Sequence, residues 1–219
     1  VNMGGPVGGT NTPPTVSAPL TIAATEGGAA IVQDLLANAT DADPGDQGKL
    51  TVGPLSYASG TTVSANPPQG LTYDAATQKL IIDPGSTVFD RLALGATQTI
   101  TVGYEILDVQ GAKVAQTSTI TITGVNDTPI GSAALTATVT KGAAASTYDL
   151  LAGATDVDDN AMLKVANITY AVGDGAATGT APGGMSYDAA THSLSFNPAD
   201  PAYADLGVGA TRPVKVGFD

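Results

Sequence analysis

Length, composition and charge already narrow the class of this protein. With 219 residues the chain has room for one large or two ordinary domains. Its net charge of −12 argues against nucleic acids and anionic membranes as partners, because both require basic patches. The absence of cysteine excludes a disulfide scaffold, zinc–thiolate sites and a cysteine nucleophile.

From the N-terminus onward, the sequence is typical of short strands separated by turns. Residues 1–10 form a Gly-rich spacer, and the rest is rich in Thr and Val, which suit strands, and in Gly and Pro, which suit turns. We expect strands over residues 19–24, 29–35, 50–58, 70–73 and 79–82. Two longer alternating segments, 99–107 and 114–124, flank a turn at 108–111 and predict a terminal β-hairpin.

Three blocks of sequence recur in the same order with a period of about 115 residues. Residues 34–43, 70–77 and 92–97 return as 149–158, 184–191 and 206–211. Each copy begins at an Asn-x-x-Pro segment, at Asn11 and at Asn126. We therefore predict repeat 1 over residues 11–125 and repeat 2 over residues 126–219.

About seven short strands in each repeat predict an all-β fold of two tandem Greek-key β-sandwiches, of immunoglobulin-like or cadherin-like type. Repeat 2 stops opposite Glu105 and has only the first arm of the terminal hairpin, so it lacks its last strand. Such a sandwich exposes an unpaired edge and part of its core. We expect the natural protein to continue, with the missing strand disordered, removed or supplied by a neighbour.

The acidic residues gather in two equivalent loops. Asp accounts for all but two of the 20 acidic residues, and the two loops contain Asp41, Asp43 and Asp46, and Asp156, Asp158 and Asp159. One interpretation is that Asp simply caps backbone N–H groups in turns. The interpretation that we favour is a site for a hard cation such as Ca²⁺, which relieves repulsion between neighbouring carboxylates.

No constellation of residues indicates an enzyme. The single histidine, His192, stands in a Tyr-Asp-Ala-Ala-Thr-His turn at the position of Gln78 in repeat 1, and no nucleophile elbow accompanies it. A glycine-rich phosphate loop and a His-rich metal motif are also missing from the sequence. We therefore expect no catalytic residues.

Several segments resemble cadherin repeats. Residues 40–50 resemble the cadherin Asp-Ala-Asp-x-Gly-x-Asn loop, and Phe89-Asp90-Arg91-Leu92 resembles its Leu-Asp-Arg-Glu segment. Residues 106–111 and 119–129 resemble the closing hairpin and the linker that follows it. Residues 92–97 are similar to cadherin-like and VCBS-type repeats of large bacterial adhesins of the RTX type, and residues 70–77 resemble bacterial cadherin- and dystroglycan-type immunoglobulin-like domains.

This resemblance implies calcium at the junction between consecutive repeats. The implied ligands at the junction of the two repeats are Glu26, Asp90, Asn126, Asp127, Asp156 and Asp158. The implied half-site at the start of repeat 1 consists of Asp41, Asp43 and Asp108. Because this linker has fewer acids than a cadherin linker, we expect one or two ions at the junction.

The implied function is that of a calcium-binding extender, or stalk, repeat of a secreted bacterial cell-surface adhesin that serves cell adhesion or biofilm formation. Its expected partners are neighbouring repeats of the same chain, without nucleic acid or membrane insertion. The alternative is a calcium-dependent module that binds cell-surface or matrix polysaccharide, for which the tyrosines offer stacking surfaces. Most tyrosines occupy repeat positions where the partner is also aromatic, which fits core or turn packing better.

Overall fold

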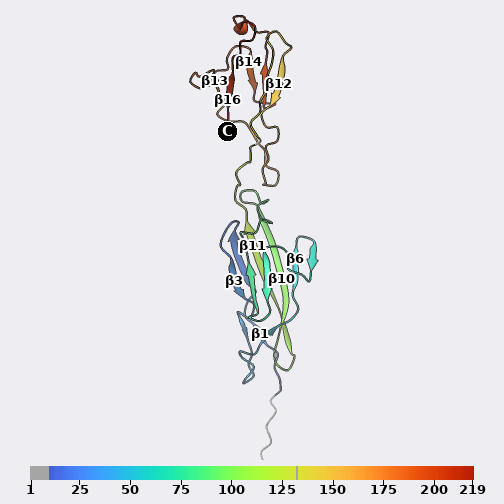
Figure 1. Ribbon diagram of the computed structural model, residues 1–219. Helices are drawn as coiled ribbons and strands as arrows, with labels where there is room; N and C mark the ends of the chain where they lie inside the picture. Colours follow the sequence, from blue (N-terminus) through green and yellow to red (C-terminus); the bar gives the residue numbers. More distant parts are fainter. Residues whose placement is uncertain (1–9, 132) are drawn as a thin grey trace, which may run out of the picture. The chain divides into compact units, whose positions relative to one another are not determined.

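The computed structural model describes residues 10–131 and 133–219, and among them it contains strands, turns and one short 3₁₀ helix (Figure 1). The predicted all-β sandwich class is confirmed. The chain divides into unit 1, residues 1–127 with 158–160, and unit 2, residues 128–157 with 161–219. Apart from Thr10, the predicted Gly-rich spacer lies outside the described residues.

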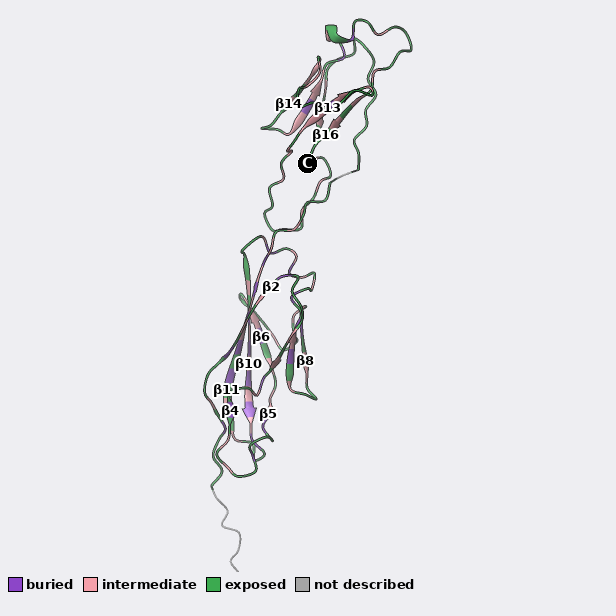
Figure 2. Cartoon of the chain, turned by 90° about the vertical axis from the view of Figure 1, so that its left-hand side faces the viewer, coloured by how far each residue is buried: buried purple, intermediate pink, exposed green. Residues whose placement is uncertain are grey.

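Unit 1 is a sandwich of two sheets, seen as two layers in Figure 2. One sheet has the strand order β2-β11-β10-β6-β7, with β5 pairing to the end of β10, and the other has the order β3-β9-β8. Two further short strands, β1 and β4, pair with each other. The strands outside the terminal hairpin are β1 (Thr15–Val16), β2 (Leu20–Thr25), β3 (Ile31–Asp34), β4 (Ala39–Thr40), β5 (Thr51–Val52), β6 (Ser56–Ser59), β7 (Thr62–Ser64), β8 (Leu71–Asp74) and β9 (Lys79–Ile82).

The predicted terminal hairpin is confirmed as the longest pairing of the molecule. β10 (Thr97–Leu107) and β11 (Lys113–Thr123) pair antiparallel along their full lengths. Their alternation places every second side chain in the core, where Ile100 and Ile120 lie opposite each other and are fully buried. The hairpin therefore forms the centre of the larger sheet.

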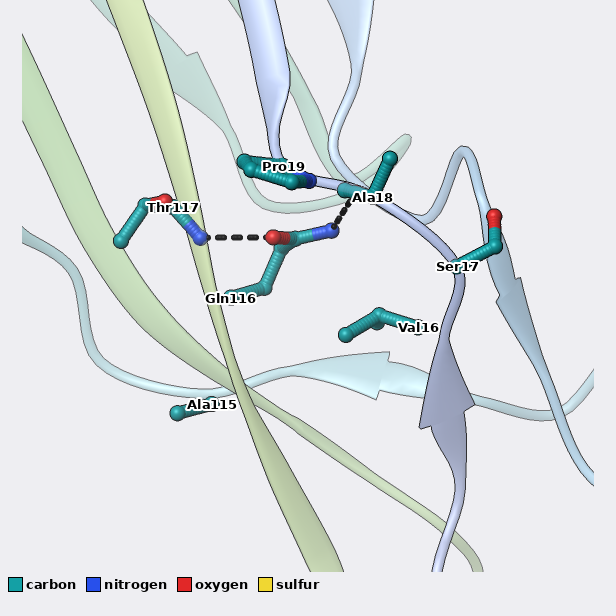
Figure 3. Close-up of a pocket in the computed structure, with 7 residues that line it drawn as sticks. All are labelled: Val16, Ser17, Ala18, Pro19, Ala115, Gln116 and Thr117. Atoms are coloured by element: carbon teal, nitrogen blue, oxygen red, sulfur yellow. Dashed lines mark hydrogen bonds between the residues drawn. The ribbon is translucent and has the colours of Figure 1, made fainter.

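The first strand changes sheets within a few residues. β1 pairs with β4, whereas β2 runs parallel to β11 from Leu20, opposite Ser118, to Thr25, opposite Thr123. At the crossing, the buried Gln116 donates from Nε2 to the carbonyl of Ala18 at 2.9 Å and accepts from its neighbour's amide (Figure 3). The Gln116 side chain thus supplies hydrogen bonds just before the point where the ladder between β2 and β11 begins.

The strand predicted over residues 50–58 is wrong as a single element. It is split into β5 and β6, because Gly53 and Pro54 interrupt it. The Gly53 amide donates to the carbonyl of Glu105 at 2.8 Å, while Pro54 has no N–H to continue the ladder. The short strand β7 that follows was not predicted. It pairs with β6 through only three residues, which is too short a segment for an alternating pattern to indicate a strand.

A buried hydrogen bond joins the two sheets at Tyr104. Its hydroxyl donates to the carbonyl of Leu35 at 2.7 Å, and burial raises the pKa of the hydroxyl far above its usual range. We expect Tyr104→Phe to destabilise unit 1 by about 1–2 kcal/mol, because the carbonyl loses its buried donor. Urea unfolding measures this loss. Tyr73→Phe, at a half-buried position, is the control, and an equal loss in both variants would contradict the prediction.

Unit 2 repeats most of this plan in the same register. β12 (Ser146–Asp149), β15 (Ser193–Phe196) and β14 (Met185–Asp188) form a sheet in that order, equivalent to β3-β9-β8. β13 (Thr169–Val172) pairs with β16 (Val214–Gly217), equivalent to β6 and β10. Tyr170 lies opposite Val216, as Tyr57 lies opposite Val102. The 3₁₀ helix Pro201–Tyr203 occupies the place of the turn before Phe89.

The core of unit 2 is smaller than that of unit 1. Among the described residues, its hydrophobic cluster has three buried members, Leu150, Tyr170 and Leu194, whereas the cluster of unit 1 has 16. Residues 135–140, equivalent to β2, are exposed and belong to no strand: Leu135 is 50% exposed, but its counterpart Leu20 only 7%. In the part of the chain that is described, no helix is long and apolar enough to cross a membrane.

Candidate metal centre

Three aspartates from two loops come together in unit 1. Carboxylate oxygens of Asp41, Asp46 and Asp108 lie within 4.8 Å of one another. Asp41 follows β4, Asp46 stands five residues further in the same loop, and Asp108 begins the turn between β10 and β11. Residues almost seventy positions apart in sequence thus converge because the hairpin turn and the loop after β4 lie at the same end of the sandwich.

Local hydrogen bonds hold two of these carboxylates in place. Oδ1 of Asp108 accepts from the amides of Gln110 and Ala112, and its Oδ2 accepts from the side chain of Asn11 at 2.9 Å. Burial raises the pKa of Asp108, but these donors together outweigh it, so the pKa lies below its usual value. Oδ1 of Asp41 accepts from the amide of Asp43 at 2.8 Å. The lowered pKa favours the ionised form of Asp108, and the hydrogen bonds orient both carboxylates before any ligand arrives.

Two oxygens of this cluster are buried without a hydrogen-bond donor. They are Oδ2 of Asp41 and Oδ2 of Asp46, and the Asp46 residue is only 5% exposed. A buried carboxylate oxygen without a donor is costly, particularly beside two other carboxylates. Lys49 forms no ion pair with them among the described residues. An oxygen-only donor set with this charge suits Ca²⁺.

The cluster differs from the predicted half-site in one member. Asp41 and Asp108 lie in the cluster, but Asp46, rather than Asp43, supplies the third carboxylate. Oδ2 of Asp43 instead accepts from the amide of Thr12 at 2.7 Å. Asp43 therefore connects Thr12, near the start of the described residues, to the loop. The tight turn after Asp43 places Asp46 in the cluster. Asn11, which holds Asp108, was also absent from the predicted set.

A second group of acids surrounds Glu26 within unit 1. Glu26 is 7% exposed, and its Oε2 accepts from the amide of Val125 at 3.0 Å. Burial raises the pKa of Glu26, the Val125 hydrogen bond lowers it, and the nearby charges of Asp127, Asp90 and Asp158 raise it further, so the net shift is upward. Four of the six predicted junction residues, Glu26 and these three aspartates, therefore lie close enough for the aspartate charges to act on Glu26.

The remaining predicted residues lie in different settings. The side-chain amide of Asn126 donates to the carbonyl of Asp127. The Asp127 amide donates to Oδ2 of the buried Asp158 at 3.0 Å. Asp156 belongs to unit 2, and its predicted role as a ligand stays a prediction. Asp159, from the same loop, forms an exposed ion pair with Arg91 at 2.9 Å.

The raised pKa of Glu26 has a testable consequence for stability. Its protonated form is favoured in the folded state, so its contribution to the stability of unit 1 falls as pH rises from about 4.5 through the raised folded pKa. In EDTA, we expect wild type to lose stability relative to Glu26→Gln over this range, because glutamine keeps an acceptor for Val125 and removes the charge. Urea midpoints of both proteins between pH 4 and 7 measure the difference, and the opposite slope would contradict the prediction.

The other recurring motif is structural. In the β8–β9 turn, Asp74 accepts from the Ala76 amide and the Thr77 hydroxyl, and the latter bond is the main reason that the pKa of Asp74 is lowered. Asp188 makes the equivalent bonds in the β14–β15 turn. Gln78 and His192 follow at the same position, with φ of 56° and 54°. His192 is therefore a turn residue, as the repeat pattern indicates.

Comparisons with known proteins found similarities to solved structures only. No protein-family model and no curated protein matches the chain. A structure of protocadherin gamma B7 extracellular cadherin domains 1–4 aligns with 94% of the chain at 12% identity and a TM-score of 0.45; the chain spans about half its length, 49%. Titin domains z1z2, in complex with telethonin, align with 95% of the chain and 96% of theirs at 14% identity and a TM-score of 0.32. Human desmocollin-1 ectodomain aligns with 93% of the chain and 41% of its own length, at 15% identity and a TM-score of 0.34.

Proposed function

We propose that this chain consists of calcium-binding extender repeats of a secreted bacterial cell-surface adhesin. The observation that carries this proposal is the cluster of Asp41, Asp46 and Asp108, in which two buried carboxylate oxygens have no donor. A cation bound there replaces carboxylate repulsion with attraction and offsets the desolvation of the buried oxygens. In such a protein, bound calcium would also restrict the movement of consecutive repeats.

Other features support an extracellular structural role. The charge of −12 keeps repeated copies soluble and mutually repelling. A chain without cysteine cannot use disulfides as cross-links, and bound calcium would serve that purpose. The bacterial origin and the adhesin class rest on the sequence resemblance of residues 92–97 and 70–77.

Most of the tyrosines proposed as stacking surfaces give the polysaccharide-binding alternative no support. Tyr57, Tyr104, Tyr170 and Tyr203 are buried, so they present no ring for a sugar to stack on. The hydroxyl of Tyr203 is also bound, donating to the carbonyl of Gly183 at 2.7 Å. We therefore propose the structural role alone.

The test is a titration of the EDTA-treated chain with Ca²⁺, followed by calorimetry and by small-angle scattering. We expect saturable binding, a higher melting temperature for unit 1 and a narrower distribution of lengths. Mg²⁺ is the matched control, because its smaller octahedral shell fits three convergent carboxylates less well. Identical melting and scattering in EDTA and in millimolar Ca²⁺ would overturn the proposal.

A further inference from the structure

Three residues of repeat 2 are part of the fold of unit 1. Residues 158–160 belong to unit 1, whereas the residues on either side of them belong to unit 2. The amide of Asp159 donates to the backbone carbonyl of Arg91 at 2.8 Å, and the Arg91 guanidinium donates to Oδ2 of Asp159 at 2.9 Å. Arg91 therefore binds this loop through both its backbone and its side chain.

Unit 1 holds Arg91 in the position that these contacts require. The turn around Arg91 is anchored in the core, because Phe89 is fully buried, Leu92 is 5% exposed, and the Leu92 amide donates to the Phe89 carbonyl at 2.8 Å. The second guanidinium nitrogen donates to Oε1 of Gln98, in β10, at 2.8 Å. Since a guanidinium is a planar fork, the Gln98 bond orients the other arm toward Asp159.

The loop enters an acidic part of unit 1. Asp158 is buried, and its charge acts on Glu26 together with the charges of Asp90 and Asp127. Among the residues that the structure describes, Arg91 is the one cation that forms an ion pair with the loop. Arg91 thus supplies an attraction that the surrounding carboxylates cannot supply, and this attraction requires no metal ion.

Neither partner of this contact has an equivalent in the other repeat. The counterpart of Arg91 is Asp205, and the counterpart of Asp159 is Pro44. Asp205 instead pairs with Arg212 at 2.7 Å, and a carboxylate at this position would repel an acidic loop. Pro44 has neither a carboxylate nor an amide hydrogen, so a loop like that of repeat 1 can form neither contact.

We propose that Arg91 and Asp159 form a calcium-independent latch that selects the order of the repeats. A repeat with arginine at the position of Arg91 accepts the loop of a following repeat that has aspartate at the position of Asp159. The latch therefore favours repeat 1 followed by repeat 2 over two consecutive copies of either repeat. The two counterparts, Asp205 and Pro44, supply the discrimination by repulsion and by a missing donor.

The test measures hydrogen exchange of the Asp159 amide by NMR in the full chain, in EDTA. Arg91→Gln and Asp159→Asn are each expected to make this amide exchange about two- to fivefold faster, which is the size of effect that a half-exposed ion pair gives. Combining Arg91→Asp with Asp159→Arg restores the pair in the opposite sense, and we expect exchange to return toward the wild-type rate.

Lys113→Gln is the matched control. Lys113 forms an ion pair with Glu105 at 2.8 Å in the same unit, and both side chains are about half exposed, as those of Arg91 and Asp159 are. The control removes one positive charge from unit 1 without touching the loop. We expect the exchange of the Asp159 amide to be unchanged in this variant.

A second pair of variants tests the selection of repeat order. Arg91→Asp gives unit 1 the residue of repeat 2, and Asp159→Pro gives the loop the residue of repeat 1. In EDTA we expect the backbone of residues 158 and 160 to gain picosecond-to-nanosecond mobility in each variant, read from NMR relaxation. The melting temperature of unit 1 verifies that both variants are folded, because neither substituted side chain is buried.

Two results would overturn the proposal. One is an Asp159 amide that exchanges at the wild-type rate in Arg91→Gln, and the other is a wild-type loop that is mobile in EDTA and ordered only in Ca²⁺. The latch is separable from the proposed function, since a chain that binds no calcium but keeps the Arg91 effect supports the latch and contradicts the calcium proposal.

Discussion

Replacing Asp46 with asparagine is expected to stabilise unit 1 in EDTA and to remove most of its response to calcium. Without a cation, Asp46 is a buried carboxylate beside Asp41 and Asp108, and charges at such separations repel by a few kcal/mol even at an effective dielectric constant of about 20. After solvent screening, we expect a gain of about 1 kcal/mol in EDTA.

With calcium, the sign of the effect reverses. Wild type gains about 2.7 kcal/mol when calcium is present at a hundred times its dissociation constant, whereas the variant has lost one charged ligand and binds at least about tenfold more weakly. Thermal melting of both proteins across a calcium series measures the crossing.

Asp83→Asn provides the matched control for this experiment. Asp83 is exposed and accepts from the amide of Gly85 at 3.1 Å, which asparagine can also do. The control removes the same charge from the same unit without touching the cluster. If Asp46→Asn and Asp83→Asn respond identically to calcium, the cluster is not the binding site.

The second large effect is expected from Phe89→Ala. Phe89 is fully buried between the sheets of unit 1, and its ring lies so close to Gly70 that a Cβ built there would approach Cε2 to 2.5 Å. Truncation removes this ring and leaves a cavity, which costs about 3–5 kcal/mol. Because the free energy of unfolding of a whole domain is only about 5–15 kcal/mol, this variant brings unit 1 close to unfolding.

Unit 2 supplies the control for Phe89. Tyr203 fills the equivalent position against Gly184, and its hydroxyl donates to the carbonyl of Gly183. Phe89→Tyr is therefore expected to cost less than about 1.5 kcal/mol, because the ring volume is kept and the equivalent carbonyl, that of Gln69, offers an acceptor. Hydrogen exchange during urea unfolding separates the two units, and a loss in unit 2 alone would contradict the assignment.

The repeat pattern predicts the fold well because each structural position occurs once in each repeat, so the same strand pairing is found in both. Tyr57 and Tyr170 occur at the same register opposite Val102 and Val216, so one alignment predicts both pairings. The elements that sequence could not predict are those with few residues or a local break. β7 pairs through three residues, and the interruption at Gly53 depends on the Glu105 carbonyl that its amide meets.

The sequence predicts where the acidic cluster of unit 1 lies but not which three carboxylates come together. The spacing of Asp41 and Asp43 suggests two ligands on one ion, yet Oδ2 of Asp43 accepts from the Thr12 amide and Asp43 is not one of the three converging residues. Asp46 enters instead because the Pro44–Gly45 turn reverses the chain, with Gly45 at φ 97°. Sequence shows that three acids are crowded in the loop, whereas only the backbone path decides which carboxylates point inward.

The parallel pairing of β2 with β11 determines how unit 1 carries mechanical load. Tension applied through the chain pulls β2 from its Leu20 end and β11 from its Thr123 end, so the two strands are drawn past each other along their length. All six rungs of the ladder then resist together rather than opening one after another. β2 and β11 thus act as a shear clamp, and pulling these two strands apart requires breaking their ladder along its whole length.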